Sequence, residues 1–267
     1  MFNSSEQFLK GTSAIVTGST SGIGLAIAKV LAKNGANITL NGFGDKDEIE
    51  KERKMLEGEY KIKAIYSPAD VSQPEAIQKM VADSRETFGR VDILINNAGI
   101  QFVAPIIEFP QEKWNAILNI NLTSAFSAIK AVLPLMKEKN WGRIINIASA
   151  HGLVASAYKS AYVAAKHGLV GLTKVVALEM AETNITCNVI CPGYVKTPLV
   201  DKQIAEQAKA HGIGEDQVVK EILLKTQPNK KFIKAEDIGA MAVFLCSSAG
   251  EAMTGEIISM DGGWTAQ

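Results

Sequence analysis

The sequence lacks any excess of charge. Its 28 lysine and arginine residues are matched by 28 aspartate and glutamate residues, so the formal net charge at pH 7 is zero. Proteins that bind nucleic acid neutralise its phosphates with a basic surface. The balance of charge therefore predicts no nucleic-acid partner.

The sequence also lacks the signs of a membrane or secreted protein. No run approaches the ~18 apolar residues that a membrane-spanning helix needs. The opening stretch, MFNSSEQFLKG, has neither the basic region nor the apolar region of a secretory signal. We therefore expect no membrane partner and a cytoplasmic location.

Cysteine is scarce, with three in 267 residues. Cys187, Cys191 and Cys246 form no CxxC pair and no even set from which disulfides are built. We interpret them as small buried side chains of a protein in a reducing cytosol, and we predict no metal site.

An alternation of two patterns is what the sequence does have. Seven apolar runs are mostly continuous, as in strands buried on both faces: SAIVTG, NITLNGF, IKAIYSPAD, VDILINNAG, RIINIAS, ITCNVICPG and EIISMDGG. Helical patterns separate them, for example at 22–34, 73–88, 111–137 and 157–180. The alternation predicts a Rossmann-like, doubly wound, seven-stranded parallel sheet. Because no linker or repeat interrupts it, we expect residues 1–267 to form one α/β domain.

One segment, 194–232, interrupts this rhythm. Two charged helical patterns flank HGIG, with no strand between them. Ligands of open parallel sheets bind at the carboxyl ends of the strands, where such an insertion can cover them. We predict a small helical lid whose closing part spans 197–225.

The stretch TGSTSGIG follows the first strand pattern and opens the first helix. Gly18 can make the tight turn, while Gly22 and Gly24 let a phosphate approach the backbone and the helix approach the sheet. The helix N-terminus favours a pyrophosphate through its free N–H groups and its dipole. Three glycines alone also fit a simple turn, but their place between strand and helix favours a dinucleotide site.

Residues at the ends of the next strand patterns can bind the adenosine and nicotinamide parts of a dinucleotide. Asp70 can accept a hydrogen bond from an adenine amino group or cap the following helix, and NNAG offers small residues to a flat ring. The second pattern ends in LNGFG, with neither an acid nor an arginine, and the glycine loop carries no basic residue. A 2′-phosphate would find no partner there, so we predict NAD, with Phe43 over the adenosine.

Tyr162 and Lys166 lie four residues apart in a helical pattern and share one face. A free tyrosine has a pKa of about 10, too high for a base at neutral pH. A nearby ammonium and a cationic nicotinamide lower that pKa, which makes Tyr162 a candidate general acid/base. Ser149, ending RIINIAS, can donate a hydrogen bond to the substrate oxygen. For the tyrosine–lysine pair alone, a surface pair is the alternative, and Tyr158 is expected only to pack.

Together these motifs stand in the order and spacing of one family. With TGSTSGIG, NNAG, NINLTSAF, YVAAK and CPGYVKT, the whole chain resembles a short-chain dehydrogenase/reductase. The resemblance implies a strand order of 3-2-1-4-5-6-7. It also implies a homotetramer, assembled mainly through the helices at 111–137 and 157–180.

The resemblance further implies roles for single residues. The catalytic tetrad would be Asn121, Ser149, Tyr162 and Lys166. Lys166 would also hold the nicotinamide ribose, and Asn121 would bend its helix and hold a water in a proton relay. The implied cofactor-binding residues are Gly18, Thr20, Ser21, Gly22, Ile23, Gly24, Phe43, Asp70, Val71, Asn97, Ala98, Gly99, Tyr162, Lys166, Pro192, Gly193, Val195 and Thr197.

Two residues near this tetrad have no role in it. His151 follows Ser149 by two residues, and Lys159 directly precedes the catalytic helix pattern. Two potential cations there favour a small anionic substrate, most simply a carboxylate, and Gln101 and Gln203 can complete a polar clamp. A solvated lysine and a loop histidine with satisfied hydrogen bonds are the alternatives.

A closer resemblance favours the clamp. NNAGIQ, SAHGLVAS, KSAYVAAKHG, CPGYVKTPLVDKQI and DGGWTAQ are similar to bacterial members of the family that oxidise (R)-3-hydroxybutyrate. The resemblance implies reversible, NAD-dependent oxidation to acetoacetate with Tyr162 as general acid/base. The implied substrate-binding residues are Gln101, His151, Lys159, Gln203 and Trp264. Trp264 would pack on the methyl end.

Two other functions compete with this one. A 3-oxoacyl-carrier-protein reductase shares the tetrad, but it normally needs NADPH and basic residues for its carrier. A non-catalytic dinucleotide-binding protein can use the same fold, since fold does not fix function. The clamp and the missing 2′-phosphate partner count against the first, and the intact tetrad counts against the second.

Overall fold

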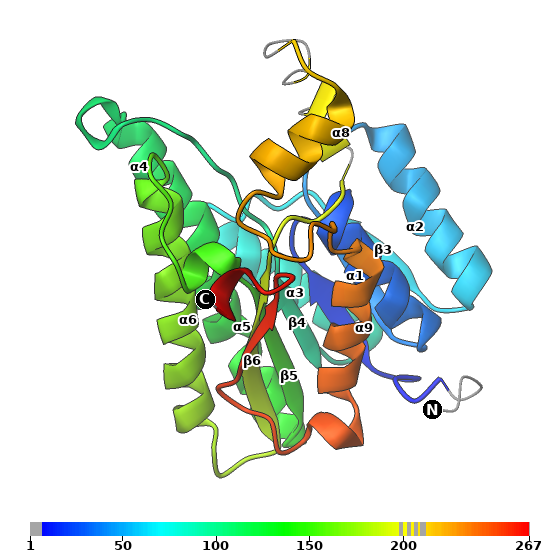
Figure 1. Cartoon of the computed structure of the whole chain (residues 1–267). Coiled ribbons are helices and arrows are strands. Elements are labelled where there is room, and N and C mark those ends of the chain that lie inside the picture. The colour runs from blue at the N-terminus through cyan, green and yellow to red at the C-terminus, as the bar shows by residue number, and fades with distance from the viewer. Residues whose placement is uncertain (1–6, 198–199, 202–203, 206–207, 209–211, 267) are drawn as a thin grey trace.

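One seven-stranded parallel sheet forms the centre of the computed structural model, which describes residues 7–197, 200–201, 204–205, 208 and 212–266. The strand order is β3-β2-β1-β4-β5-β6-β7, which confirms the predicted order and fold class (Figure 1). The strands are β1 (Ser13–Val16), β2 (Asn37–Asn41), β3 (Ala64–Ser67), β4 (Ile93–Asn96), β5 (Gly142–Ile147), β6 (Ile185–Pro192) and β7 (Ile257–Met260).

Helices cover both faces of the sheet. One layer contains α1 and α9, which pack on each other, and the opposite layer contains α3, α5 and α6 (Figure 1). The α-helices are α1 (Gly22–Lys33), α2 (Lys46–Tyr60), α3 (Pro74–Phe88), α4 (Gln111–Leu118), α5 (Ser124–Lys139), α6 (Ser160–Glu179), α8 (Glu215–Gln217) and α9 (Ala235–Cys246). The 3-10 turns are η1 (Ile106–Glu108), η3 (Ala150–Gly152), η5 (Ser248–Gly250) and η6 (Trp264–Ala266), and the π-helical segments are η2 (Asn119–Thr123) and η4 (Val218–Leu223).

The continuous apolar runs are explained by this two-sided cover. In β1, Ala14 and Val16 belong to the core on the α1 and α9 side, while Ile15 belongs to the core on the α3 and α5 side. All three side chains are fully buried. Burying a Val or Ile side chain contributes roughly 1.5–3 kcal/mol, so both faces of the strand need apolar residues.

The helix expected at 111–137 is observed as one helical stretch, Gln111–Lys139, with a π-helical segment inside it. The π-helical segment η2 separates α4 from α5. Such segments often mark functional sites because they redirect a side chain. The insertion lies around Asn121, whose amide is bonded to another part of the chain, as described below.

Two helical stretches, Gln111–Lys139 and Ser160–Glu179, are long and apolar enough to cross a membrane by length and composition. This corrects the reading that no run approaches that length. Both are core helices of the fold, because α5 packs on β4 and β5 while α6 packs on β6. The cytoplasmic location stays a prediction.

The three cysteines are buried and free, as expected. Burial raises the pKa of Cys187 to about 12, of Cys191 to about 11 and of Cys246 to about 12. Among the described residues, no group of three or more His, Cys, Asp or Glu side chains could hold a metal ion.

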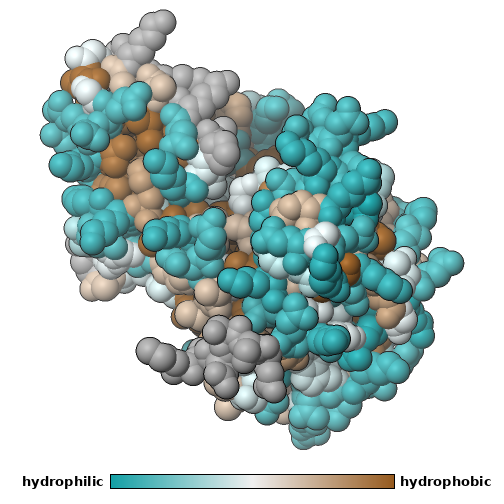
Figure 2. Space-filling view, turned by 90° about the vertical axis from the view of Figure 1, so that its right-hand side faces the viewer, coloured by the Kyte–Doolittle hydropathy of each residue, from teal (hydrophilic) through white to brown (hydrophobic). Residues whose placement is uncertain are grey.

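The segment 194–232 follows β6 and carries α8 and η4, which Figure 1 places at one end of the molecule. Its described residues have a small core of their own, in which Ile204, Val218 and Leu223 are buried and Tyr194 and Phe232 are partly buried. Figure 2 shows brown apolar atoms gathered at this end, beside atoms drawn in grey. That the segment closes over a ligand stays a prediction.

Candidate active site

The glycine turn between β1 and α1 is fixed against the end of β4. Gly18 has a φ of 62°, and a Cβ on it would lie 2.9 Å from the Cα of Ala98. Asn97 holds the turn, because its Nδ2 donates to the carbonyl oxygens of Thr17 at 2.9 Å and Gly18 at 3.0 Å. Only glycine combines this backbone with this close approach.

The first turn of α1 has the properties of an anion site. The side chain of Ser21 makes no capping hydrogen bond, and the turn carries no acidic residue. A Cβ on Gly22, where φ is 56°, would meet nothing nearer than the Thr197 Cγ2 atom at 3.8 Å. An uncapped helix start with open space beside Gly22 and no nearby acid fits a pyrophosphate.

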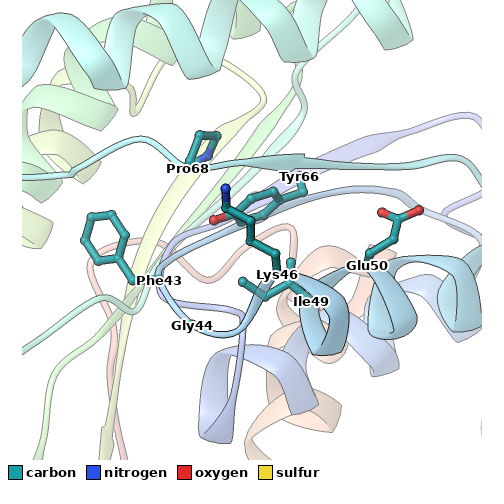
Figure 3. Close-up of a pocket in the computed structure, with 7 residues that line it drawn as sticks. All are labelled: Phe43, Gly44, Lys46, Ile49, Glu50, Tyr66 and Pro68. Atoms are coloured by element: carbon teal, nitrogen blue, oxygen red, sulfur yellow. The ribbon is translucent and has the colours of Figure 1, made fainter.

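A pocket of about 490 Å³ lies beyond the ends of β2 and β3, where the adenosine is expected. Its lining residues are Phe43, Gly44, Lys46, Ile49, Glu50, Tyr66 and Pro68. Figure 3 shows Lys46 extending from the start of α2 into the space between Phe43 and Tyr66, while Glu50 points away. Sequence reasoning missed Lys46, because it lies in the helix that follows the strand.

Other predicted cofactor residues surround these two regions. Thr20 donates its hydroxyl to the Phe43 carbonyl at 2.8 Å. Asp70 accepts from the Ser72 N–H at 2.9 Å, and α3 begins later, so the alternative that Asp70 caps this helix is wrong. Val71 is buried. After β6, Val195 pairs with Ile233 in an isolated bridge.

Asn121 lies in η2 and is almost fully buried. Its Oδ1 accepts from the Ile100 N–H at 2.9 Å, and its Nδ2 donates to the Ile100 carbonyl at 3.0 Å. The amide thus fixes the loop after β4, next to the exposed Gln101. The π-helical segment lies where the resemblance implies that Asn121 bends its helix, and the bend itself stays a prediction.

Ser149 and His151 lie together at the end of β5. The Ser149 Oγ accepts from the His151 N–H at 3.2 Å and lies 3.4 Å from the His151 Nδ1. His151 is buried, and burial, with the charge of Lys159 adding to it, lowers its pKa to about 4. At neutral pH the ring is uncharged, which corrects the view of His151 as a cation. Burial also lowers the pKa of the half-buried Lys159.

Tyr162 and Lys166 share the inner face of α6. The Lys166 Nζ lies 5.6 Å from the centre of the Tyr162 ring and donates to the Ile147 carbonyl at 2.8 Å. Burial lowers the pKa of Lys166 to about 8. Burial also raises the pKa of Tyr162, while a hydrogen bond with Ser149 lowers it. Without a bound cofactor, the tyrosine is therefore a neutral phenol at pH 7.

Aromatic rings connect Tyr162 to the segment 194–232. His151 lies edge-on to Tyr162 at 6.0 Å and to Trp264 at 5.0 Å between ring centres. Tyr194, the first residue of segment 194–232, stacks on Trp264 at 5.7 Å. Asp261 holds the turn that carries Trp264 by accepting from the Thr265 N–H and hydroxyl. Tyr194 was missed, although it stands inside the CPGYVKT motif.

The structure thus brings together most of the predicted site. Ser149, His151, Tyr162, Lys166 and Trp264 converge at the carboxyl ends of β5 and β6. Gln203 lies outside the described residues.

The doubly wound fold with its glycine turn and tyrosine–lysine helix defines an NAD(P)-dependent oxidoreductase. The chain belongs to the short-chain dehydrogenase/reductase family. A family profile described as enoyl-(acyl carrier protein) reductase matches residues 18–265.

Similar proteins are known by sequence and by structure. The D-beta-hydroxybutyrate dehydrogenase of Rhizobium meliloti is 57% identical, covering 95% of this chain and 98% of that protein. The protein of the same name from Cupriavidus necator is 55% identical, covering 97% and 100%. A crystal structure from Agrobacterium tumefaciens, provisionally described as a gluconate dehydrogenase, has a TM-score of 0.87 and 34% identity, covering 98% of each chain.

Proposed function

We propose that this protein is a 3-hydroxybutyrate dehydrogenase that interconverts (R)-3-hydroxybutyrate and acetoacetate. The observation that carries the proposal is the group of side chains next to Tyr162. Lys159 supplies a positive charge, His151 supplies a neutral hydrogen-bonding ring, and Trp264 closes the space with an apolar face. A four-carbon hydroxy acid has a carboxylate, a hydroxyl and a methyl group that match these three features.

The residues of the tetrad divide the proton chemistry among them. Ser149 orients the substrate hydroxyl by a hydrogen bond, and Tyr162 Oη takes its proton. Lys166, held by the Ile147 carbonyl, places an ammonium beside the Tyr162 phenolate, which becomes a phenol when it accepts this proton. The dinucleotide, when bound, supplies the hydride acceptor and, in its oxidised form, a positive charge. Asn121 is proposed to hold a water in the proton relay to Lys166.

We propose NAD as the dinucleotide. The Asp45 carboxylate occupies the N-terminus of α2, accepting from the N–H groups of Asp47 and Glu48, each at 3.0 Å. A ribose 2′-phosphate near this helix start would therefore meet the Asp45 carboxylate rather than free N–H groups. Lys46 is the single basic residue lining the pocket, and Glu50 is its single acidic residue.

The proposed assembly is a homotetramer formed through α5 and α6. These helices expose large apolar side chains, with Phe126 51%, Val175 52% and Leu178 78% exposed. Isolated apolar surface residues are common, but several on adjacent helices fit a protein interface.

The test is the initial rate of NADH or NADPH formation with (R)- or (S)-3-hydroxybutyrate and NAD⁺ or NADP⁺, in all four pairings. We expect rapid turnover only for the R enantiomer with NAD⁺. Turnover with NADP⁺ alone would overturn the choice of cofactor. No turnover in any pairing, in a protein that binds NADH, would assign the tetrad to another carbonyl substrate.

A further inference from the structure

Tyr158 has a backbone conformation that is costly for its residue type. Its φ is 69°, in the left-handed region that bulky residues avoid. Of the other non-glycine residues with positive φ in the described part of the chain, Lys61 and Asn140 end helices, where this conformation is common. Tyr158 instead lies just before the start of α6, beside the active site.

The side chain of Tyr158 does not account for this conformation. It is 60% exposed, so the ring gains little from packing. The backbone is held instead, because the Ala104 N–H donates to the Tyr158 carbonyl at 3.0 Å. Ala104 belongs to the loop after β4 that also carries Gln101. Strain that persists under such restraint tends to mark functional sites.

The residue after Tyr158 is the cationic residue of the clamp. Lys159 occupies the N-cap position of α6, with φ −117° and ψ 35°, and its carbonyl accepts from the Val163 N–H at 2.9 Å. Its side chain is half-buried, whereas the ring of Tyr158 points to solvent. The charge of Lys159 also acts on His151. The turn at Tyr158 therefore separates an exposed ring from a half-buried lysine whose charge acts on His151.

We propose that Tyr158 is a positioning residue: its left-handed backbone, pinned by Ala104, aims the Lys159 ammonium at the substrate carboxylate. The inference rests on the proposed function for the identity of that carboxylate. Its essential part is the backbone angle and not the aromatic ring. Residues that accept positive φ can replace Tyr158, and β-branched residues cannot.

The test compares substitutions that differ in their tolerance of positive φ. Tyr158→Gly and Tyr158→Asn should keep the KM for (R)-3-hydroxybutyrate within about twofold, because both adopt this angle readily. Tyr158→Val should raise KM at least ~10-fold, the scale of one lost charged hydrogen bond. The kcat at saturation and the Kd for NADH should change little. If the valine variant does not fold, Tyr158→Ala replaces it, since it differs from the glycine variant only by a Cβ.

The matched control is Lys61→Val. Lys61 has a φ of 58° at the end of α2, so this change should lower Tm without changing KM. An increase in KM for Lys61→Val would mean that general destabilisation, rather than position, causes the effect. Equal losses in Tyr158→Gly, Tyr158→Asn and Tyr158→Val would assign the role to the ring and overturn the inference.

A second readout does not depend on the substrate. Displacing the Lys159 ammonium should raise the pKa of His151, as measured by NMR titration of the histidine ring. We expect this rise in Tyr158→Val and in Lys159→Ala, but not in Tyr158→Gly or Lys61→Val. If the wild-type enzyme does not oxidise hydroxybutyrate, the proposed function fails while this titration still decides the positioning role. Unchanged titration and unchanged KM in Tyr158→Val would overturn it.

Discussion

Burial of Tyr162 and Lys166 disfavours the charged forms of both side chains. Burial raises the pKa of Tyr162 and lowers that of Lys166 to about 8, so both shifts oppose the phenolate–ammonium pair. The charge of Lys166, which favours the phenolate, can be predicted from the spacing of the two residues. The cost of burying both groups cannot, because burial depends on the fold. Under the proposed mechanism, the phenolate therefore depends on the positive charge that an oxidised dinucleotide would bring when bound.

Replacing Tyr162 by phenylalanine tests the acid/base assignment. We expect kcat to fall by about 10²–10⁴-fold, the usual contribution of a positioned acid/base group. The Kd for NADH, measured by fluorescence titration, should stay within about twofold, because one ribose contact is a small part of a dinucleotide site. Near-normal turnover in this variant would move the acid/base role to another residue.

The uncharged His151 gives a prediction for pH dependence. Its pKa of about 4 lies below the ordinary value of 6.5, so the ring stays neutral as the pH falls from 7.5 to about 5.5. The ratio of KM between wild type and His151→Gln should be constant over that range. A ratio of wild-type KM to His151→Gln KM that decreases as the pH falls through 6.5 would mean that His151 binds the carboxylate as a cation. Initial rates at five pH values suffice.

At the scale of elements, the strands were predictable because burial on both faces leaves a continuous apolar run. The π-helical segment η2 and the start of α6 were not predictable from local sequence pattern. The division of 111–137 by η2 depends on Asn121 bonding to Ile100, and these residues are 21 apart in sequence. The start of α6 at Ser160, rather than at 157, depends on the turn at Tyr158. Neither a long-range hydrogen bond nor a positive φ can be predicted from the local sequence pattern.

Part of the candidate site was predictable from the positions of strand ends and helix faces. Motif spacing placed Ser149, Tyr162 and Lys166, because strand ends and helix faces follow from the pattern. Tyr194 and Lys46 were missed, since their roles depend on which surface each element turns toward the ligand. The prediction that His151 could be a cation was wrong, because burial lowers its pKa and burial depends on the whole fold.

The ends of the lid are joined by one buried amide. Gln227 is fully buried, and its Oε1 accepts from the Tyr194 N–H at 3.1 Å while its Nε2 donates to the Lys231 carbonyl. Gln227→Leu removes both bonds and leaves two part-buried backbone groups without this partner. We expect a loss of about 1–3 kcal/mol in the free energy of unfolding.

The effect on function should be selective. A misplaced Tyr194 also misplaces Trp264, so the KM for hydroxybutyrate should rise several-fold while the Kd for NADH is kept. The matched control is Gln217→Leu, since Gln217 is an exposed lid glutamine whose side chain donates to Glu221. Equal effects of the two changes on KM would remove the special role of Gln227.

At the scale of the whole molecule, the apolar faces of α5 and α6 predict assembly. Leu178→Glu places a charge in the proposed interface and should reduce the tetramer to smaller species in sedimentation velocity at micromolar concentration. Ile107→Glu is the control, because Ile107 is 90% exposed but lies in η1, outside those two helices. A wild-type protein that sediments as a monomer would contradict the proposed tetramer. The one-domain organisation predicts a single cooperative transition for each protomer.

The burial of all three cysteines has a practical consequence for spectroscopy. Their raised pKa values keep the thiols protonated at neutral pH, and protonated buried thiols react poorly with maleimides. The natural sequence is therefore a quiet background for labelling. A cysteine introduced at an exposed lid position, such as Glu221, would be the one that takes a fluorophore, and its emission could follow lid motion during turnover.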